Sequence, residues 1–126
     1  MKDAQNKKWL KARKIHTVFN MTPDLDESPS CCRTVRFSIL DSPDDVDKMV
    51  GKGLDWADEI MEAMEAGPVL VHCKEGRQRS ATLVTLIMGL KNPQKLHTVI
   101  KKLRSKRPIA LTPQPTFAKA LKKWFI

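Results

Sequence analysis

Apolar and polar residues alternate or cluster in ways that predict three strands. Residues 15–21 are rich in β-branched and aromatic side chains, and residues 32–40 alternate before they become apolar, so each stretch suits a strand. The short apolar run over 69–72 is typical of a buried parallel strand. Residues 22–30, between the first two stretches, are rich in turn formers and should be a loop.

Helical spacing of apolar residues follows in four further stretches. Over residues 46–66, apolar side chains recur at intervals of three and four, with acidic residues on the other face. Asp44 or Asp45 is placed to cap this helix, and Gly67 and Pro68 should end it. The other expected helices are an apolar one over 80–90, amphipathic ones over 94–106 and 115–125, and a short basic helix or arm over 7–14.

This order of elements predicts an α/β fold, with a small, mostly parallel central sheet of about four strands flanked by helices. We expect one domain over residues 1–126, of which 1–14 form a basic N-terminal helix or arm. The sequence has no stretch of about 18 or more apolar residues, which predicts that no segment spans a membrane.

Positive charge is concentrated in the second half of the chain. Residues 66–126 hold 13 Lys and Arg and a single acidic residue, Glu75, so this half has a net charge of +12, whereas the whole chain has +9. Residues 1–65 hold 10 basic and 13 acidic residues and carry −3. Such a field attracts anionic partners, whether phosphoproteins, inositol lipids or nucleic acid. A solubilising surface would give the same excess, so charge alone leaves the function open.

The three cysteines show neither a disulfide framework nor the paired spacing of a zinc site, because Cys31 and Cys32 are adjacent and Cys73 lies far along the chain. We therefore expect no metal or other cofactor, and a reducing compartment, cytoplasmic or nuclear, in which a thiol stays free. A disulfide from Cys31 or Cys32 to Cys73 is conceivable, but small buried residues are the simpler interpretation.

One segment carries specific chemistry, at the junction between the strand over 69–72 and the following helix. Its residues are His72, Cys73, Lys74, Glu75, Gly76, Arg77, Gln78, Arg79 and Ser80. Backbone N–H groups of such a loop and the positive end of the helix can ring a phosphate, and a glycine lets the loop curl tightly. A cysteine in that ring should have a lowered pKa and act as a nucleophile. Arg79 can hold two phosphate oxygens with its planar guanidinium, and Ser80 can donate a hydrogen bond to the sulfur.

The run HCKEGRQRS resembles the His-Cys-five residues-Arg-Ser/Thr signature of the protein tyrosine phosphatase superfamily, and it is most similar to the dual-specificity branch. The resemblance covers roughly residues 10–125, although only the loop is a highly specific motif. It implies that Cys73, Arg79 and Ser80 are catalytic and that residues 74–79 bind the substrate phosphate.

The resemblance also implies a general acid from an earlier loop. The stretch 37–41 resembles the strand that delivers this aspartate, and Asp41 lies 32 residues before Cys73, a separation similar to that of the family. Asp44 is the second choice, and a turn-forming role is the alternative for Asp41. His72 is expected to support the nucleophile through hydrogen bonds. Asn20 resembles an asparagine that ends a strand and ties a neighbouring loop.

The resemblance predicts a phosphatase for phosphorylated proteins. The chain has no tyrosine, so it lacks the tyrosine-bearing loop that deepens the pocket of strict phosphotyrosine phosphatases, and a shallow pocket admits phosphoserine and phosphothreonine too. Lys74 and Arg77 also resemble the basic loop residues of phosphoinositide phosphatases, which makes anionic lipid headgroups an alternative substrate. A non-catalytic phosphoprotein-binding module is a further alternative, and nucleic acid is a weaker one.

The chain is shorter than most domains that it resembles. The sheet would then be reduced, or its edge covered in another way. A partner subunit that contributes its N-terminal helix is one such cover, so a homodimer is one expectation.

Overall fold

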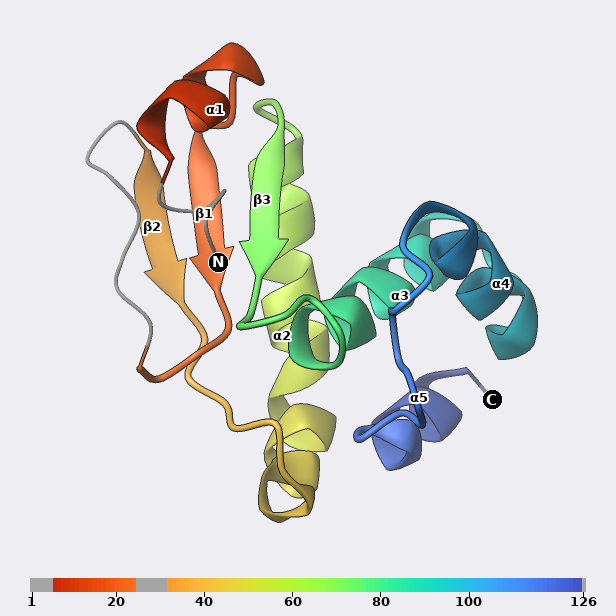
Figure 1. Ribbon diagram of the computed structural model, residues 1–126. Helices are drawn as coiled ribbons and strands as arrows, with labels where there is room; N and C mark the ends of the chain where they lie inside the picture. The colour runs from red at the N-terminus through yellow and green to blue at the C-terminus, as the bar shows by residue number, and fades with distance from the viewer. Residues whose placement is uncertain (1–5, 25–31, 126) are drawn as a thin grey trace.

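The computed structural model describes residues 6–24 and 32–125, and its centre is a parallel sheet with the strand order β2-β1-β3 (Figure 1). The central strand β1 (Thr17–Asn20) pairs with β2 (Arg33–Arg36) on one side and with β3 (Val69–His72) on the other. All four residues of β1 are buried, as expected for a strand with a neighbour on each side. The α/β class and the parallel sheet are confirmed.

The described residues contain the three strands located in the sequence, fewer than the four or so expected of the whole sheet, and β2 is shorter than the predicted stretch 32–40. The amide of Phe37 still donates a hydrogen bond of 2.9 Å to the carbonyl of Asn20 in β1. The chain then turns out of the sheet, and the carbonyl of Ile39 accepts a hydrogen bond from Arg79 instead of from a neighbouring strand. The apolar end of the predicted strand is therefore a connection that is held by a side chain.

Side chains of the sheet alternate between two apolar layers. Phe19, Val35 and Val71 pack in the main core against α2 (Val46–Met64), whereas Val18 and Leu70 lie on the other face in a smaller cluster with Leu10. Leu10 belongs to α1 (Lys7–Ala12), which lies at the end of the sheet where the strands begin (Figure 1). The predicted basic helix therefore closes this end of the second layer.

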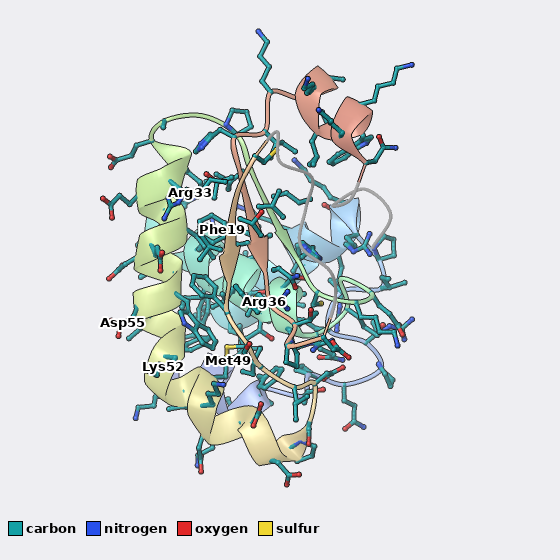
Figure 2. All side chains as sticks on the ribbon, turned by 90° about the vertical axis from the view of Figure 1, so that its left-hand side faces the viewer. Phe19, Arg33, Arg36, Met49, Lys52 and Asp55 are labelled. Carbon is teal, nitrogen blue, oxygen red and sulfur yellow. The ribbon has the colours of Figure 1, made fainter. Side chains whose placement is uncertain are left out.

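Helix α2 confirms the amphipathic pattern. Figure 2 shows Phe19 and Met49 between the sheet and this helix, while the exposed Lys52 and Asp55 point away from the sheet. The helix follows a short 3-10 turn, η2 (Pro43–Asp45). Asp45 is the N-cap residue, as one of the two predicted choices, but its carboxylate makes no capping bond. It accepts a hydrogen bond of 2.7 Å from the amide of Leu40 instead.

The three remaining helices are also confirmed. They are α3 (Arg79–Lys91), α4 (Leu96–Lys106) and α5 (Ala118–Trp124). In Figure 1 they lie beyond β3 on the side away from β2, with α3 and α5 packed on α2 and α4 packed on α3. Trp124 of α5 fits over Gly53 of α2, at a position where the helix has no side chain. None of the helices in the described residues is long and apolar enough to cross a membrane.

Candidate active site

The loop between β3 and α3 borders a cavity of about 190 Å³. The loop leaves the sheet at the end where the parallel strands stop (Figure 1). Ligands of open α/β sheets usually bind at this end. Each residue that lines the cavity was predicted from the sequence as a site residue. They are Asp41, Cys73, Lys74, Glu75, Arg77, Gln78 and Arg79.

Cys73 is almost completely buried, with 2% of its surface exposed. Its sulfur lies 3.3 Å from the hydroxyl oxygen of Ser80. Burial raises the pKa of the Cys73 thiol and is the largest single influence on it, but hydrogen bonds from the hydroxyl and backbone N–H of Ser80 and from the backbone N–H of Gly76, together with the charge of Arg79, outweigh it. The pKa of Cys73 therefore lies below the ordinary value of a thiol, which favours the nucleophilic thiolate.

Arg79 stands in the first turn of α3, and only 8% of its surface is exposed. Its Nη1 donates a hydrogen bond of 2.9 Å to the carbonyl oxygen of Ile39, which fixes the plane of the guanidinium. Its Nε is buried and finds no hydrogen-bond partner among the described residues. A buried donor without a partner is costly, and Arg79 lines the cavity, so its guanidinium suits an anionic ligand there.

The loop carries three further charged side chains. Lys74 and Glu75 are exposed, and Arg77 is partly exposed, with its Nε 3.5 Å from Oε2 of Glu75. An ion pair this exposed stabilises the fold little. Lys74 and the ion-paired Arg77 both line the cavity.

Gln78, predicted as a substrate-binding residue, has its side chain turned away to anchor the loop. Its Nε2 donates hydrogen bonds of 2.9 Å to the carbonyls of Thr112 and Gln114, and its Oε1 accepts one of 3.0 Å from the amide of Thr116. The side chain therefore ties the loop to the segment that leads into α5. Only the backbone of Gln78 remains for a ligand.

Asp41 and Asp44, the two candidates for the general acid, lie in different places. Asp41 is exposed and lines the cavity, whereas Asp44 lies in the turn η2, where its amide donates to the hydroxyl of Ser42, and does not line it. The described geometry thus favours Asp41 over Asp44 for proton transfer.

His72 and Asn20 lie behind the loop at the ends of β3 and β1. Nδ1 of His72 donates to the carbonyl of Cys73 at 3.3 Å, so His72 orients the backbone of the nucleophile. Burial lowers the pKa of His72 and is the largest influence on it, which keeps the imidazole neutral. Oδ1 of Asn20 accepts hydrogen bonds from the amide and the hydroxyl of Thr22 and so holds the turn after β1.

Cys32 is not placed to trap Cys73. Cys32 precedes β2 and donates to the carbonyl of Ile15 at 3.2 Å, at the end of the sheet where the strands begin, whereas Cys73 follows β3 at the other end. The length of a strand separates them, and a disulfide requires Cα atoms within about 7 Å. Cys31 lies outside the described residues.

Sequence reasoning missed Arg107, which contacts the loop from the end of α4. Its Nη2 donates to the carbonyl of Glu75 at 2.6 Å and its Nε donates to the carbonyl of Gly76 at 3.1 Å. It also missed the carbonyl of Ile39 that holds Arg79. Neither residue belongs to the signature, and the sequence gives no local signal for either contact.

Comparison with known proteins places these features in a family. A family model described as "Dual specificity phosphatase, catalytic domain" matches residues 1–126. No curated protein sequence matches the chain.

Several solved structures have the same fold. Human DUSP28 has a TM-score of 0.86 at 22% sequence identity, over 97% of this chain and 85% of that one. A mouse putative dual specificity phosphatase, complexed with zinc tungstate, has a TM-score of 0.85 at 23% identity, over 96% and 76% of the two chains. The phosphatase domain of Yvh1 from Chaetomium thermophilum has a TM-score of 0.77 at 21% identity, over 99% and 86%.

Proposed function

The chain belongs to the dual-specificity phosphatase catalytic-domain family and is a cysteine-based protein phosphatase, and from that premise we propose that it hydrolyses phosphotyrosine, phosphoserine and phosphothreonine monoesters through a phosphocysteine intermediate on Cys73. A cytoplasmic or nuclear, reducing compartment would suit a thiol of this kind.

One observation carries this proposal: Cys73 and Arg79 line the same small cavity. The sulfur is buried beside Ser80, and Nε of Arg79 is buried without a partner among the described residues. A phosphate dianion above the sulfur would accept hydrogen bonds from this donor and from the amides of the loop. Positioning and charge neutralisation of this kind are most of what phosphoryl transfer requires.

In the first step the Cys73 thiolate attacks phosphorus. The S–P bond forms while the bond from phosphorus to the side-chain oxygen of the substrate breaks. Asp41, protonated, gives its proton to that leaving oxygen, which is the role its place at the rim of the cavity allows. Arg79 binds two of the equatorial oxygens throughout, since its plane is already fixed by Ile39.

In the second step water attacks phosphorus and the S–P bond breaks. The Asp41 carboxylate takes the proton of the water, and inorganic phosphate leaves. The departing thiolate is stabilised by the Ser80 hydroxyl, 3.3 Å away. Cys73 then returns to its starting state without a net change in redox state.

The modest size of the cavity, about 190 Å³, supports this breadth of substrates. The sequence contains no tyrosine, so it lacks the tyrosine-bearing loop that deepens the pocket of strict phosphotyrosine phosphatases. Phosphoserine and phosphothreonine are shorter than phosphotyrosine and need a shallow pocket to reach the sulfur.

A phosphoinositide is the second candidate substrate. Lys74 and Arg77 both line the cavity and carry their charges at its rim. Headgroups with several phosphates would use these additional cations.

The test is release of inorganic phosphate from a phosphotyrosine peptide, a phosphothreonine peptide and a soluble phosphoinositide, by the wild type and by Cys73→Ser. We expect release from both peptides by the wild type alone. A preference for the inositide would move the assignment to lipid substrates. Binding of the peptides without release by the wild type would indicate a phosphoprotein-binding module.

A further inference from the structure

The peptide unit between Glu75 and Gly76 has its carbonyl oxygen on one side of the loop and its N–H on the other, and the contacts of both groups bear on the site. Its carbonyl oxygen, on Glu75, accepts a hydrogen bond of 2.6 Å from Nη2 of Arg107. Its N–H, on Gly76, is one of the backbone groups that lower the pKa of the Cys73 thiol. In a trans peptide the C=O and N–H point in opposite directions. A donor that holds the carbonyl from outside therefore aims the N–H inward.

The next two peptide units are held in the same way. The carbonyl of Gly76 accepts a hydrogen bond of 3.1 Å from Nε of Arg107, and the carbonyl of Arg77 accepts one of 2.6 Å from the amide of Leu111. By the same trans geometry, the N–H groups of Arg77 and Gln78 are turned to the inner side of the loop. Three successive carbonyls thus face the segment 107–111, and their peptide N–H groups face the other way.

We infer that Arg107 is a positioning residue for the phosphate-binding loop, because its guanidinium pins two adjacent carbonyls and thereby aims the N–H groups of Gly76 and Arg77 at the sulfur and the substrate phosphate. Arg107 itself is not among the residues that line the cavity. It acts through the loop, from α4's C-terminal end.

The local geometry is matched to an arginine. The two carbonyls lie on adjacent residues, and Nε and Nη2 of one planar guanidinium donate to them together, which a lysine ammonium on a flexible stem cannot reproduce. Gly76 has a φ of +68°, in the left-handed region. A Cβ added at Gly76 would lie 2.7 Å from Nη2 of Arg107. The absence of a side chain at residue 76 therefore allows both the loop's conformation and the close approach of Arg107.

The test compares Arg107→Ala and Arg107→Lys with Lys106→Ala. Lys106 is the neighbouring exposed cation, and no hydrogen bond or ion pair joins its side chain to another described residue, so its loss removes the same charge without touching the loop. Thermal unfolding of each variant shows whether it is folded at the assay temperature.

The first readout is the pH dependence of Cys73 alkylation by iodoacetamide, which requires no turnover and therefore tests the inference even if the proposed phosphatase activity fails. Gly76's N–H favours the thiolate, so the midpoint should move to higher pH in Arg107→Ala, less far in Arg107→Lys, and not at all in Lys106→Ala.

The second readout rests on the proposed function. Misdirected amides stabilise the transition state less, so kcat/KM of Arg107→Ala should fall by about 10- to 100-fold, mainly in kcat. An unchanged alkylation midpoint in Arg107→Ala would overturn the inference, as would equal effects in Lys106→Ala, which would indicate long-range charge. Full recovery in Arg107→Lys would show that the planar fork is not required.

Discussion

Nη1 of Arg79 lies 2.9 Å from the carbonyl oxygen of Ile39, two residues before Asp41. This hydrogen bond joins the phosphate-binding loop to the segment that carries the predicted general acid. It occupies one nitrogen of the guanidinium and leaves Nε directed elsewhere, buried and without a partner among the described residues. Arg79 therefore both lines the cavity and holds the segment that leads to the predicted acid.

Arg79→Lys should retain the positive charge and lose most of the activity. A lysine cannot hold Ile39 and two phosphate oxygens in one plane. We expect kcat/KM for a phosphotyrosine peptide to fall by about 10²- to 10³-fold, as for loss of a transition-state donor. Steady-state kinetics measure this, with circular dichroism to verify folding. Activity of Arg79→Lys near that of the wild type would contradict the assigned role.

Ser80→Ala should raise the pKa of Cys73. Burial, the largest influence, already raises that pKa, and the Ser80 hydroxyl is the first of the groups that lower it. Alkylation follows the thiolate and so increases as pH rises through the pKa of Cys73. The midpoint of alkylation by iodoacetamide should therefore move to higher pH in Ser80→Ala.

A matched control for this measurement is Thr85→Val. It removes a buried hydroxyl from the same helix α3, but that hydroxyl donates to the carbonyl of Ala81 and not to the sulfur. Its alkylation midpoint should stay at the wild-type pH. Equal midpoints in Ser80→Ala and the wild type would show that the hydroxyl does not stabilise the thiolate.

Asp41→Asn and Asp44→Asn should separate the two candidates for the general acid. Asparagine cannot protonate the leaving oxygen, so Asp41→Asn should lose about 10²- to 10⁴-fold in kcat on a phosphothreonine peptide. The loss should be smaller on p-nitrophenyl phosphate, whose leaving group needs no proton. Asp44→Asn should be close to the wild type on both substrates. The reverse order of losses would assign the acid to Asp44.

Substitution by alanine at two glycines of α2 should change the stability of the fold in opposite directions. A Cβ on Gly53 would overlap the ring of Trp124, whereas a Cβ on Gly51 would meet nothing within 4 Å. Gly53→Ala should therefore destabilise the fold by about 1–3 kcal/mol through overpacking. Gly51→Ala should stabilise it by about 0.5–1 kcal/mol through helix propensity. Urea denaturation measures both, and a stable Gly53→Ala would contradict the packing of α5 on α2.

The elements of the fold could largely be predicted because their signals are local. The apolar run over 69–72 became β3 with the same bounds, and α2 follows the spacing of its apolar residues. The end of β2 was missed because residues 37–40 are as apolar as a strand, and only the distant Arg79 shows that Ile39 leaves the sheet. The periodicity of apolar residues predicts which side chains are buried, but it does not predict the hydrogen-bond partner of each backbone group.

The site could be predicted only as far as one continuous motif describes it. Cys73, Arg79 and Ser80 stand within eight residues, so the motif alone brings Cys73 and Arg79 to one cavity and Ser80 to the sulfur of Cys73. Arg107 is separated from Glu75 by 32 positions, and an exposed arginine at a helix end has many other uses. The direction of the Gln78 side chain, which anchors the loop, could not be predicted, because a place in the loop fixes only the backbone.

The central claim is that Cys73 carries the phosphoryl group, and trapping the intermediate tests it most directly. The protein is mixed with a phosphotyrosine peptide, quenched in acid within milliseconds, digested and examined by mass spectrometry. The account predicts one phosphoryl group on the peptide that contains Cys73 in the wild type, and none in Cys73→Ser, which should also release no phosphate. Phosphate release by Cys73→Ser at the wild-type rate, or turnover by the wild type with the phosphoryl group on another residue, would contradict it.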